Sequence, residues 1–490
     1  MLLLWLDAWF VSCFLALSGL AIGTTAQSWS CPLSINPTDI LRADNTTQNF
    51  GRLRISGRTL AFVEWEWLLN SSARIVRFGR DDETTAIPED FIIPNNATSV
   101  DLAGDGNLVA VTFRNDSVQD EDPSCNWHCY HVVRFYERRV DSNNNGWLAA
   151  RGSDLVVQTK WDYILSFNGP GNVLAVRTWR NYDVAVTVYQ YNENSAQWSQ
   201  LGNEIPTGER GDQSLAKSVL RMAVSHSNGN GRVQIYGYSN LGGNWELEDD
   251  LEGDNNESMQ FGRSLAMNGD GTVLVVGSIG GVDLLVRNHG NNGVLWSRQA
   301  SLKPNDPLAS DNWFGNSVGI SNDGQTVVVG SRARTFNGLY AAGRVYLFKR
   351  FGHNTNDDAK QWYQVATMEG SNMDDFLGEY VAIDEQATFI AATTASESDD
   401  YLRYAKIGRC IESAATSTTP LPTPQPSPSP TQVPSARPTM KPLVTPSQSQ
   451  WPSTQPPTVT AESPAQHTFP HSNLFLIVVM LSTTYLQAQC

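Results

Sequence analysis

Basic residues are scarce in this chain, and two common catalytic signatures are missing. The sequence has 34 lysines and arginines against 50 aspartates and glutamates, which gives a net charge of −16. Such a balance disfavours nucleic acid and anionic membrane surfaces as partners. No H-E-x-x-H or P-loop sequence occurs, and the seven histidines are scattered. The sequence therefore specifies no zinc-protease, nucleotide or Ser-His-Asp site, and it predicts no cofactor.

A repeated stretch is the clearest feature that is present. Residues 261–278 read FGRSLAMNGDGTVLVVGS, and residues 314–331 read FGNSVGISNDGQTVVVGS. In both, an alternating run, an Asp-Gly turn and a valine-rich run predict two antiparallel strands. Five weaker copies occupy 50–63, 97–113, 161–179, 377–394 and 215–227, the last with its turn missing.

Each unit continues with a third β-rich run and then, in most units, a tryptophan in a fourth run. These tryptophans are Trp147, Trp198, Trp245, Trp296 and Trp362. Four-stranded units repeated about a centre form a propeller. The prediction is an all-β fold, a seven-bladed β-propeller of four-stranded antiparallel blades over residues 27–411. One tryptophan per blade is predicted to pack between neighbouring sheets rather than to stack on a sugar.

The two clear copies resemble FG-GAP repeats, the units of the integrin α-subunit propeller. Phe-Gly opens each copy, and Val-Gly-Ser stands where Val-Gly-Ala-Pro is usual. The chain is most similar to secreted FG-GAP-like proteins of diatoms and related protists, which carry Pro/Ser-rich stalks. This resemblance implies a seven-bladed propeller with an extracellular binding or adhesion role. Calcium needs six to eight oxygen ligands, and only Asp270 and Asp323 remain in these turns, so we predict turn formers and no metal site.

The last unit lacks a fourth run, and the N-terminal text supplies a replacement. Residues 28–35 (SWSCPLSI) resemble the fourth-run text of 198–205. Residues 29–35 are therefore predicted to form the outer strand of the last blade, which suggests one disulfide between Cys31 and Cys410. The simplest complement is a second disulfide between Cys125 and Cys129, one of three possible pairings. The alternative for 125–131 is a zinc site that adds His128 and His131.

Both ends of the chain differ in composition from the repeats. Residues 1–26 carry an apolar stretch followed by Thr-Thr-Ala and predict a signal peptide, with an uncleaved anchor as the alternative. Five N-x-[ST] sequons and the paired cysteines then predict a secreted glycoprotein. The sequons are at Asn45, Asn70, Asn96, Asn115 and Asn256.

The C-terminal region predicts a stalk and an anchor that attach the propeller to a membrane. Residues 412–466 are rich in serine, threonine and proline and have no apolar periodicity, so we expect a disordered stalk. Residues 467–490 form a hydrophobic tail whose apolar run, 474–486, is shorter than the roughly 20 residues of a spanning helix. A GPI-anchor signal with Ala461 as acceptor is predicted, and a short membrane tail is the alternative. The expected location is the outer face of the plasma membrane or the cell wall.

The function predicted from these features is binding of an extracellular protein or glycan through loops at one end of the blades. The candidate loops are 114–131 and 331–343, because long connections on a rigid scaffold often carry function. Two alternatives stay open, a structural wall protein and a surface carbohydrate-active hydrolase with Glu64 and Glu66 as its carboxylates. The tripeptide Arg210-Gly211-Asp212, a sequence that integrins bind, is expected in an exposed loop.

Overall fold

The computed structural model describes most of the repeat region. The described residues are 40–42, 48–66, 70–78, 89–93, 96–114, 130–140, 145–158, 165–180, 183–208, 212–226, 230–253, 259–290, 293–305, 313–351, 361–395 and 404–409. The chain divides into two units, 1–416 and 417–490, and all of these residues belong to the first. Within this described part, no helix is long and apolar enough to cross a membrane.

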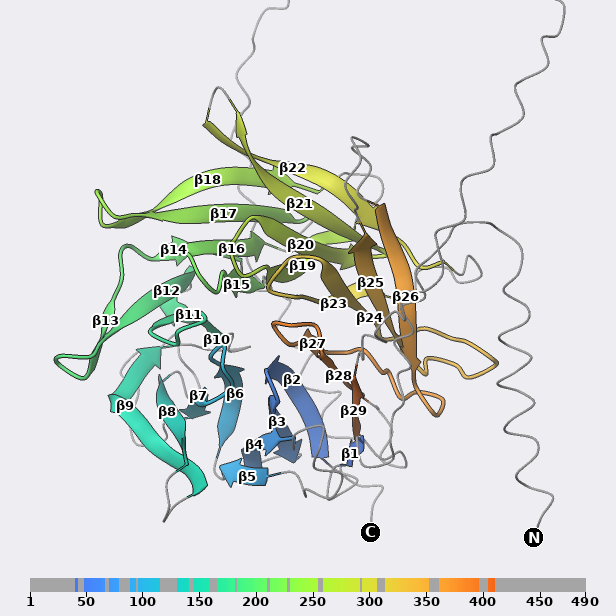
Figure 1. Cartoon of the computed structure of the whole chain (residues 1–490), viewed down its shortest axis with the longest axis horizontal. Coiled ribbons are helices and arrows are strands. Elements are labelled where there is room, and N and C mark those ends of the chain that lie inside the picture. Colours follow the sequence, from blue (N-terminus) through green and yellow to red (C-terminus); the bar gives the residue numbers. More distant parts are fainter. Residues whose placement is uncertain are drawn as a thin grey trace, which may run out of the picture. The chain divides into compact units, whose positions relative to one another are not determined.

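Seven antiparallel sheets follow one another about a common centre in chain order (Figure 1). Blade 1 contains β2 (Gln48–Ser56), β3 (Thr59–Glu66), β4 (Asn70–Arg77) and β5 (Glu89–Ile93). Blade 2 contains β6 (Ala97–Leu102), β7 (Leu108–Arg114), β8 (Tyr130–Val140) and β9 (Asn145–Gln158). Blade 3 contains β10 (Leu165–Phe167), β11 (Val173–Arg180), β12 (Asp183–Asn192) and β13 (Gln197–Gln200), and β14 (Ile205–Pro206) also pairs with β12.

The remaining four blades have the same order. Blade 4 contains β15 (Gln213–Leu215), β16 (Arg221–His226), β17 (Arg232–Ser239) and β18 (Asn244–Glu252). Blade 5 contains β19 (Met259–Met267), β20 (Val273–Ile279), β21 (Gly281–Gly290) and β22 (Gly293–Leu302). Blade 6 contains β23 (Phe314–Ile320), β24 (Thr326–Ser331), β25 (Arg344–Phe351) and β26 (Gln361–Glu369). Blade 7 contains β27 (Val381–Ile383), β28 (Phe389–Thr393), β29 (Tyr404–Arg409) and β1 (Ile40–Arg42). The predicted seven four-stranded blades are confirmed.

The N-terminal segment does complete the last blade, but through a different stretch from the one predicted. Ile40 pairs with Lys406 and Arg42 with Tyr404, so β1 is the outer strand of blade 7. The prediction of residues 29–35 for this strand was therefore wrong. Cys31 and Cys410 lie outside the described residues, and so do Cys125 and Cys129.

The turns of the clear repeats are shaped by their own side chains. Asp270 Oδ1 accepts hydrogen bonds from the Thr272 amide at 3.0 Å and its hydroxyl at 2.6 Å. Asp323 Oδ1 accepts one from the Gln325 amide at 2.9 Å. These are the local bonds by which aspartate favours turns, so the predicted turn-forming role of both aspartates is confirmed. In the described residues, no three His, Cys, Asp or Glu side chains gather closely enough to hold a metal ion.

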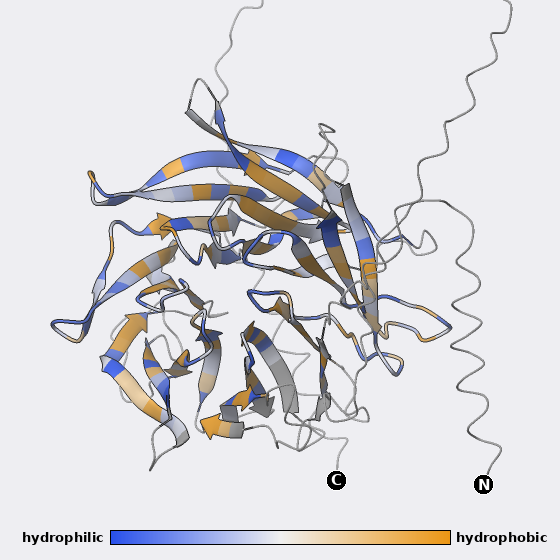
Figure 2. Ribbon diagram, in the orientation of Figure 1, coloured by the Kyte–Doolittle hydropathy of each residue, from blue (hydrophilic) through white to orange (hydrophobic). Residues whose placement is uncertain are grey.

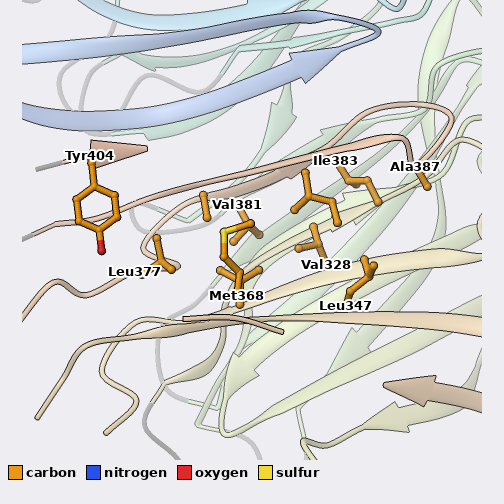
Figure 3. Close-up of a cluster of buried hydrophobic side chains, with 11 residues drawn as sticks. Val328, Leu347, Met368, Leu377, Val381, Ile383, Ala387 and Tyr404 are labelled. Atoms are coloured by element: carbon orange, nitrogen blue, oxygen red, sulfur yellow. The ribbon is translucent and has the colours of Figure 1, made fainter. Parts of the chain in front are cut away.

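Among the described residues, seven clusters of buried hydrophobic side chains form the core, and each lies between two neighbouring blades. Figure 2 shows hydrophobic residues along the strands and hydrophilic residues in most of the connections. In Figure 3, Val328 and Leu347 of blade 6 face Val381 and Ile383 of blade 7. A blade cannot bury both of its faces by itself, which explains why the units occur in series.

The tryptophans act as the predicted wedges between sheets. Trp245 and Trp296 are 4% and 2% exposed, and each packs with residues of the preceding blade. The Trp245 indole N–H donates to the Leu201 carbonyl at 2.9 Å, so the polar atom of this buried ring is satisfied. Trp147, Trp198 and Trp362 lie at the corresponding places of their blades.

Candidate functional site

The innermost strands of all seven blades surround a central cavity of about 170 Å³. Polar side chains in its wall join neighbouring blades by accepting hydrogen bonds from backbone amides. Ser166 accepts from Leu215, Ser214 from Met267 and Ser317 from Val381, at distances of 3.1, 3.0 and 3.0 Å. Each of these bonds joins one blade to the next, and together they hold the channel wall.

Two ion pairs in the channel wall connect blade 1 with blade 2 and with blade 4. Arg52 Nη1 lies 2.9 Å from Asp212 Oδ1, and Arg54 Nε lies 2.9 Å from Asp101 Oδ1. Both arginines come from β2, two residues apart, and so lie on one face of that strand. The second carboxylate oxygen of Asp212 accepts from the Leu265 amide at 2.9 Å. Burial by itself raises the pKa of Asp212, but Arg52 and the Leu265 amide together hold it below its usual value.

This geometry bears on the Arg-Gly-Asp tripeptide. Asp212 is 8% exposed and its carboxylate is fully engaged with Arg52 and Leu265. An aspartate in this position does not offer its carboxylate to another protein, so the expectation of an exposed loop was wrong for this residue. Arg210 and Gly211 lie outside the described residues.

The sequence contains one G-x-S-x-G pattern that the sequence analysis above did not identify. Residues 315–319 read Gly-Asn-Ser-Val-Gly, which matches the G-x-S-x-G pattern of serine hydrolases. That chemistry needs the serine on a sharp turn between a strand and a helix. Ser317 instead lies inside β23, and its hydroxyl accepts from the Val381 amide. The pattern here belongs to the blade repeat and its serine is structural.

Glu64, one of the two predicted hydrolase carboxylates, is not among the residues that line the central cavity. Glu64 lies on β3, is 4% exposed and pairs with Arg74 at 3.1 Å. The side chain of Glu66 lies outside the description. His131, a ligand of the alternative zinc site, is a buried residue of β8, and His128 is outside the described residues. Among the sequons, Asn96 precedes β6 and Asn70 begins β4, and the other three lie outside.

A cluster of cationic and aromatic side chains lies where the inner strands of blades 5 to 7 begin. We call Arg263, Trp313, Arg332 and Glu379 the mouth cluster. The guanidinium carbons of Arg263 and Arg332 lie 4.7 and 4.8 Å from the indole centroid of Trp313. Arg332 also pairs with Glu379 at 2.7 Å. Since Arg263 lines the central cavity, this cluster borders the channel.

The predicted loop 331–343 is a compact structure next to this cluster. Phe336 and Leu339 exchange two backbone hydrogen bonds around Asn337 and Gly338, which have φ of 49° and 80°. This is the left-handed geometry of a two-residue hairpin, which Asn-Gly favours. Tyr340, the next residue, is 66% exposed. In the other predicted loop, residues 115–129 lie outside the description.

The loop 331–343 is joined by its backbone to the connection between blades 6 and 7. The amides of Asp374, Phe376 and Leu377 donate to the carbonyls of Tyr340, Ala341 and Ala342 at 2.9, 3.0 and 3.0 Å. Three bonds in series fix the two segments to each other. Exposed side chains on them, Tyr340 and Met373, are therefore held on a rigid surface.

The turn of blade 7 makes stability depend on pH. Asp384 is 1% exposed, and burial raises its pKa to about 6, with Glu385 acting in the same direction. Between pH 4 and 6 the folded chain therefore holds a proton that the unfolded chain releases, so stability falls as pH rises. Asp384→Asn is expected to stabilise the protein by about 1–3 kcal/mol at pH 7 and by much less at pH 4.

Blade 5 indicates that asparagine fits this position, because the corresponding Asn268 Oδ1 accepts from the Val273 amide at 2.8 Å. Denaturant unfolding of the unchanged protein and of Asp384→Asn gives the difference in free energy of unfolding at pH 4 and at pH 7. An equal effect at the two pH values would show that the proton on Asp384 is not its cause.

The chain is similar to a known repeat family and to several solved structures. A family model described as the FG-GAP repeat matches residues 296–348. No curated protein matches the chain. Similar solved structures include the propeller domain of the Trilobed protease from Pyrococcus furiosus, at 12% identity over 74% of this chain and 95% of that one, with a TM-score of 0.44. Hydrazine synthase of Kuenenia stuttgartiensis also matches at 12% identity, over 76% of this chain and 98% of that one, with a TM-score of 0.47.

The seven four-stranded blades define the class of this protein as a β-propeller. The match at 296–348 together with these blades supports an FG-GAP β-propeller. The closer likeness to diatom and protist proteins stays a prediction. A β-propeller with an FG-GAP repeat fits a role in ligand binding or recognition.

Proposed function

We propose that this protein is an extracellular recognition propeller, tethered to the cell surface by its C-terminal region, that binds a ligand at the end of the blades bearing loop 331–343. The observation that carries the proposal is the rigid, exposed surface made by Tyr340 and Met373. These side chains are 66% and 45% exposed on segments that three backbone hydrogen bonds join. Exposed aromatic and methionine side chains on fixed backbone are characteristic of binding surfaces.

The extracellular part of the proposal is supported by the sequence. A signal peptide at 1–26, the sequons, the stalk at 412–466 and the tail at 467–490 form a consistent set for a tethered surface protein. The hydrolase alternative receives no comparable support, because Glu64 is committed to Arg74.

Expression of the full chain in a eukaryotic secretory host tests both parts of this proposal. Intact cells are expected to display the propeller to an antibody and to lose it after treatment with phosphatidylinositol-specific phospholipase C. They are also expected to retain extracellular matrix or wall material from the source organism without releasing sugar or peptide fragments. Resistance to the phospholipase would support the short membrane tail instead. Fragment release would contradict recognition as the function.

The binding surface itself is tested by a double substitution, Tyr340→Ser with Met373→Ser. Both side chains are exposed, so stability is expected to change by less than about 0.5 kcal/mol, while retention of the ligand is lost. The matched control is Leu241→Ser, which changes a fully exposed apolar side chain in the turn between β17 and β18 of blade 4. Equal retention by the double variant and the control would place the binding surface elsewhere.

A further inference from the structure

The geometry points to the chemistry of the ligand, an inference that rests on the function proposed above. We propose that the mouth cluster binds the carboxylate of an acidic segment in a partner protein through Arg263 and Arg332. An apolar side chain next to that carboxylate then packs on Tyr340 and Met373. The surface would thus recognise one aspartate or glutamate beside an apolar residue.

Arg263 is a partly buried cation that is bonded only to neutral groups. Its Nε donates to Asn316 Oδ1 at 2.9 Å, and its Nη1 donates to Gln260 Oε1 at 2.8 Å. A guanidinium has five N–H groups, and the described residues provide partners for only these two. Burial lowers the pKa of Arg263; the negative charge of Glu379 opposes this shift, and the positive charge of Arg332 adds to it. A desolvated cation of this kind gains from an anion, because much of the cost of removing its water is already met.

The two guanidinium groups are held in place before any ligand arrives. Both lie against Trp313, so their carbons are within about 9.5 Å of each other. Arg332 also lies 5.6 Å from the ring centroid of Phe376. Stacking on flat rings restricts long side chains that otherwise lose rotamer freedom on binding. The buried Nε of Arg332 has no hydrogen-bond partner in the described structure.

Phe376 connects this charged cluster to the exposed apolar pair. Its ring contacts Arg332, and its backbone amide donates to the Ala341 carbonyl, the residue after Tyr340. The amide of Asp374, the residue after Met373, donates to Tyr340 itself. Arg332, Phe376 and the exposed apolar pair are therefore carried by two segments that backbone hydrogen bonds join. Arginine, tyrosine, tryptophan and methionine are also the residues enriched in protein interfaces.

The charge balance favours one carboxylate over a polyanion. In the mouth cluster, two arginines face a single carboxylate, Glu379, which leaves one excess positive charge. The nearby Arg52 and Arg54 are already paired with Asp212 and Asp101. Elsewhere the chain is strongly acidic, with a net charge of −16, so a sulfated glycan or another extended polyanion would be repelled. A protein segment with a single acidic side chain fits this local charge.

Two capped tripeptides test the proposal with the full chain. The probes are N-acetyl-Phe-Asp-Leu-amide and its neutral counterpart N-acetyl-Phe-Asn-Leu-amide, observed by saturation-transfer NMR. The aspartate peptide is expected to bind about tenfold more tightly than the asparagine peptide, because charge-assisted hydrogen bonds exceed neutral ones by that order. Arg263→Gln and Arg332→Gln are expected to remove this preference, and Arg263→Lys to retain part of it.

Arg232→Gln is the matched control, since Arg232 forms an exposed ion pair with Asp250 on blade 4. It is expected to leave the preference unchanged, and circular dichroism verifies that each variant is folded. Equal binding of the two peptides, or a preference that survives Arg263→Gln, would overturn the inference. Stronger binding of a trigalacturonate probe than of the aspartate peptide would also overturn it and assign the cluster to an acidic glycan. If cells carrying Arg263→Gln still retain their extracellular ligand, the proposed function stands and only this inference fails.

Discussion

Replacing Asp212 with asparagine is expected to lower the free energy of unfolding by about 2–3 kcal/mol at pH 7. The substitution removes the carboxylate that neutralises Arg52 in the channel wall, while the asparagine oxygen can still accept from the Leu265 amide. A buried pair is costly to break because the remaining charge loses its counterion away from water. Chemical denaturation followed by tryptophan fluorescence measures the effect.

The pH dependence gives this prediction a second readout. Arg52 holds the pKa of Asp212 below its usual value in the folded protein, so the pair stabilises the fold above the ordinary carboxyl pKa. That contribution disappears as pH falls through the lowered pKa. The difference in free energy of unfolding between Asp212→Asn and the unchanged protein should therefore be largest at pH 7 and become small in strong acid.

A surface ion pair provides the control. Arg134 and Asp154 lie on β8 and β9, and their side chains are 45% and 37% exposed. Water and salt screen such a pair, so Asp154→Asn is expected to cost less than about 1 kcal/mol. If the two asparagine variants lose the same stability, the channel pair is no more important to the fold than a surface contact.

The blade architecture could be predicted from the sequence because the clear repeats carry short sequence signals for their strands and turns. The Asp-Gly turn, the valine-rich run and one tryptophan all arise from short-range preferences that the structure retains. Local rules were less reliable where the repeat is degenerate. The sequence of 215–227 has no turn signal, yet residues 216–220 connect β15 to β16. The strand β1 has three residues and no repeat signature, which is why the outer strand was placed too early in the chain.

The candidate site was only partly predictable, because its parts come from distant segments. Loop 331–343 was identified by its length, whereas the mouth cluster joins residues from three blades. Arg52 and Asp212 are 160 positions apart, and no spacing rule relates them. The Arg-Gly-Asp string suggested an exposed loop because glycine and charged residues usually indicate one. The fold instead turns its aspartate inward, where Arg52 compensates the burial.

Each clear repeat has one glycine in Phe-Gly and one in Val-Gly-Ser, and the structure gives a single reason for both. Gly330 of Val-Gly-Ser faces Gly378, which follows the opening residue of the next blade and has φ of 95°. A Cβ added at Gly330 would lie 2.2 Å from the Gly378 carbonyl oxygen. One blade earlier, a Cβ added at Gly277 would lie 2.3 Å from the Gly315 oxygen. The repeat therefore keeps both glycines because the backbones of adjacent blades touch at this point.

Gly330→Ala is accordingly expected to cost about 3 kcal/mol, since overpacking against backbone cannot be relieved by a change of rotamer. The control is Gly146→Ala in β9, where an added Cβ meets no atom within 4 Å, and its effect should stay within about 0.5 kcal/mol. Thermal and denaturant unfolding of both variants gives the comparison. Similar stability of the two would mean that adjacent blades separate at little cost.

Blade 4 indicates that two adjacent blades can accommodate a serine in place of the glycine of Val-Gly-Ser. Ser225 occupies the position that corresponds to Gly330, and its hydroxyl donates to the Gly262 carbonyl of the next blade at 2.6 Å. A methyl group offers no such bond, so Gly330→Ser is expected to lose less stability than Gly330→Ala even though serine is larger. A greater loss for serine would show that the two clear repeats, unlike blade 4, are closed to any side chain at this contact.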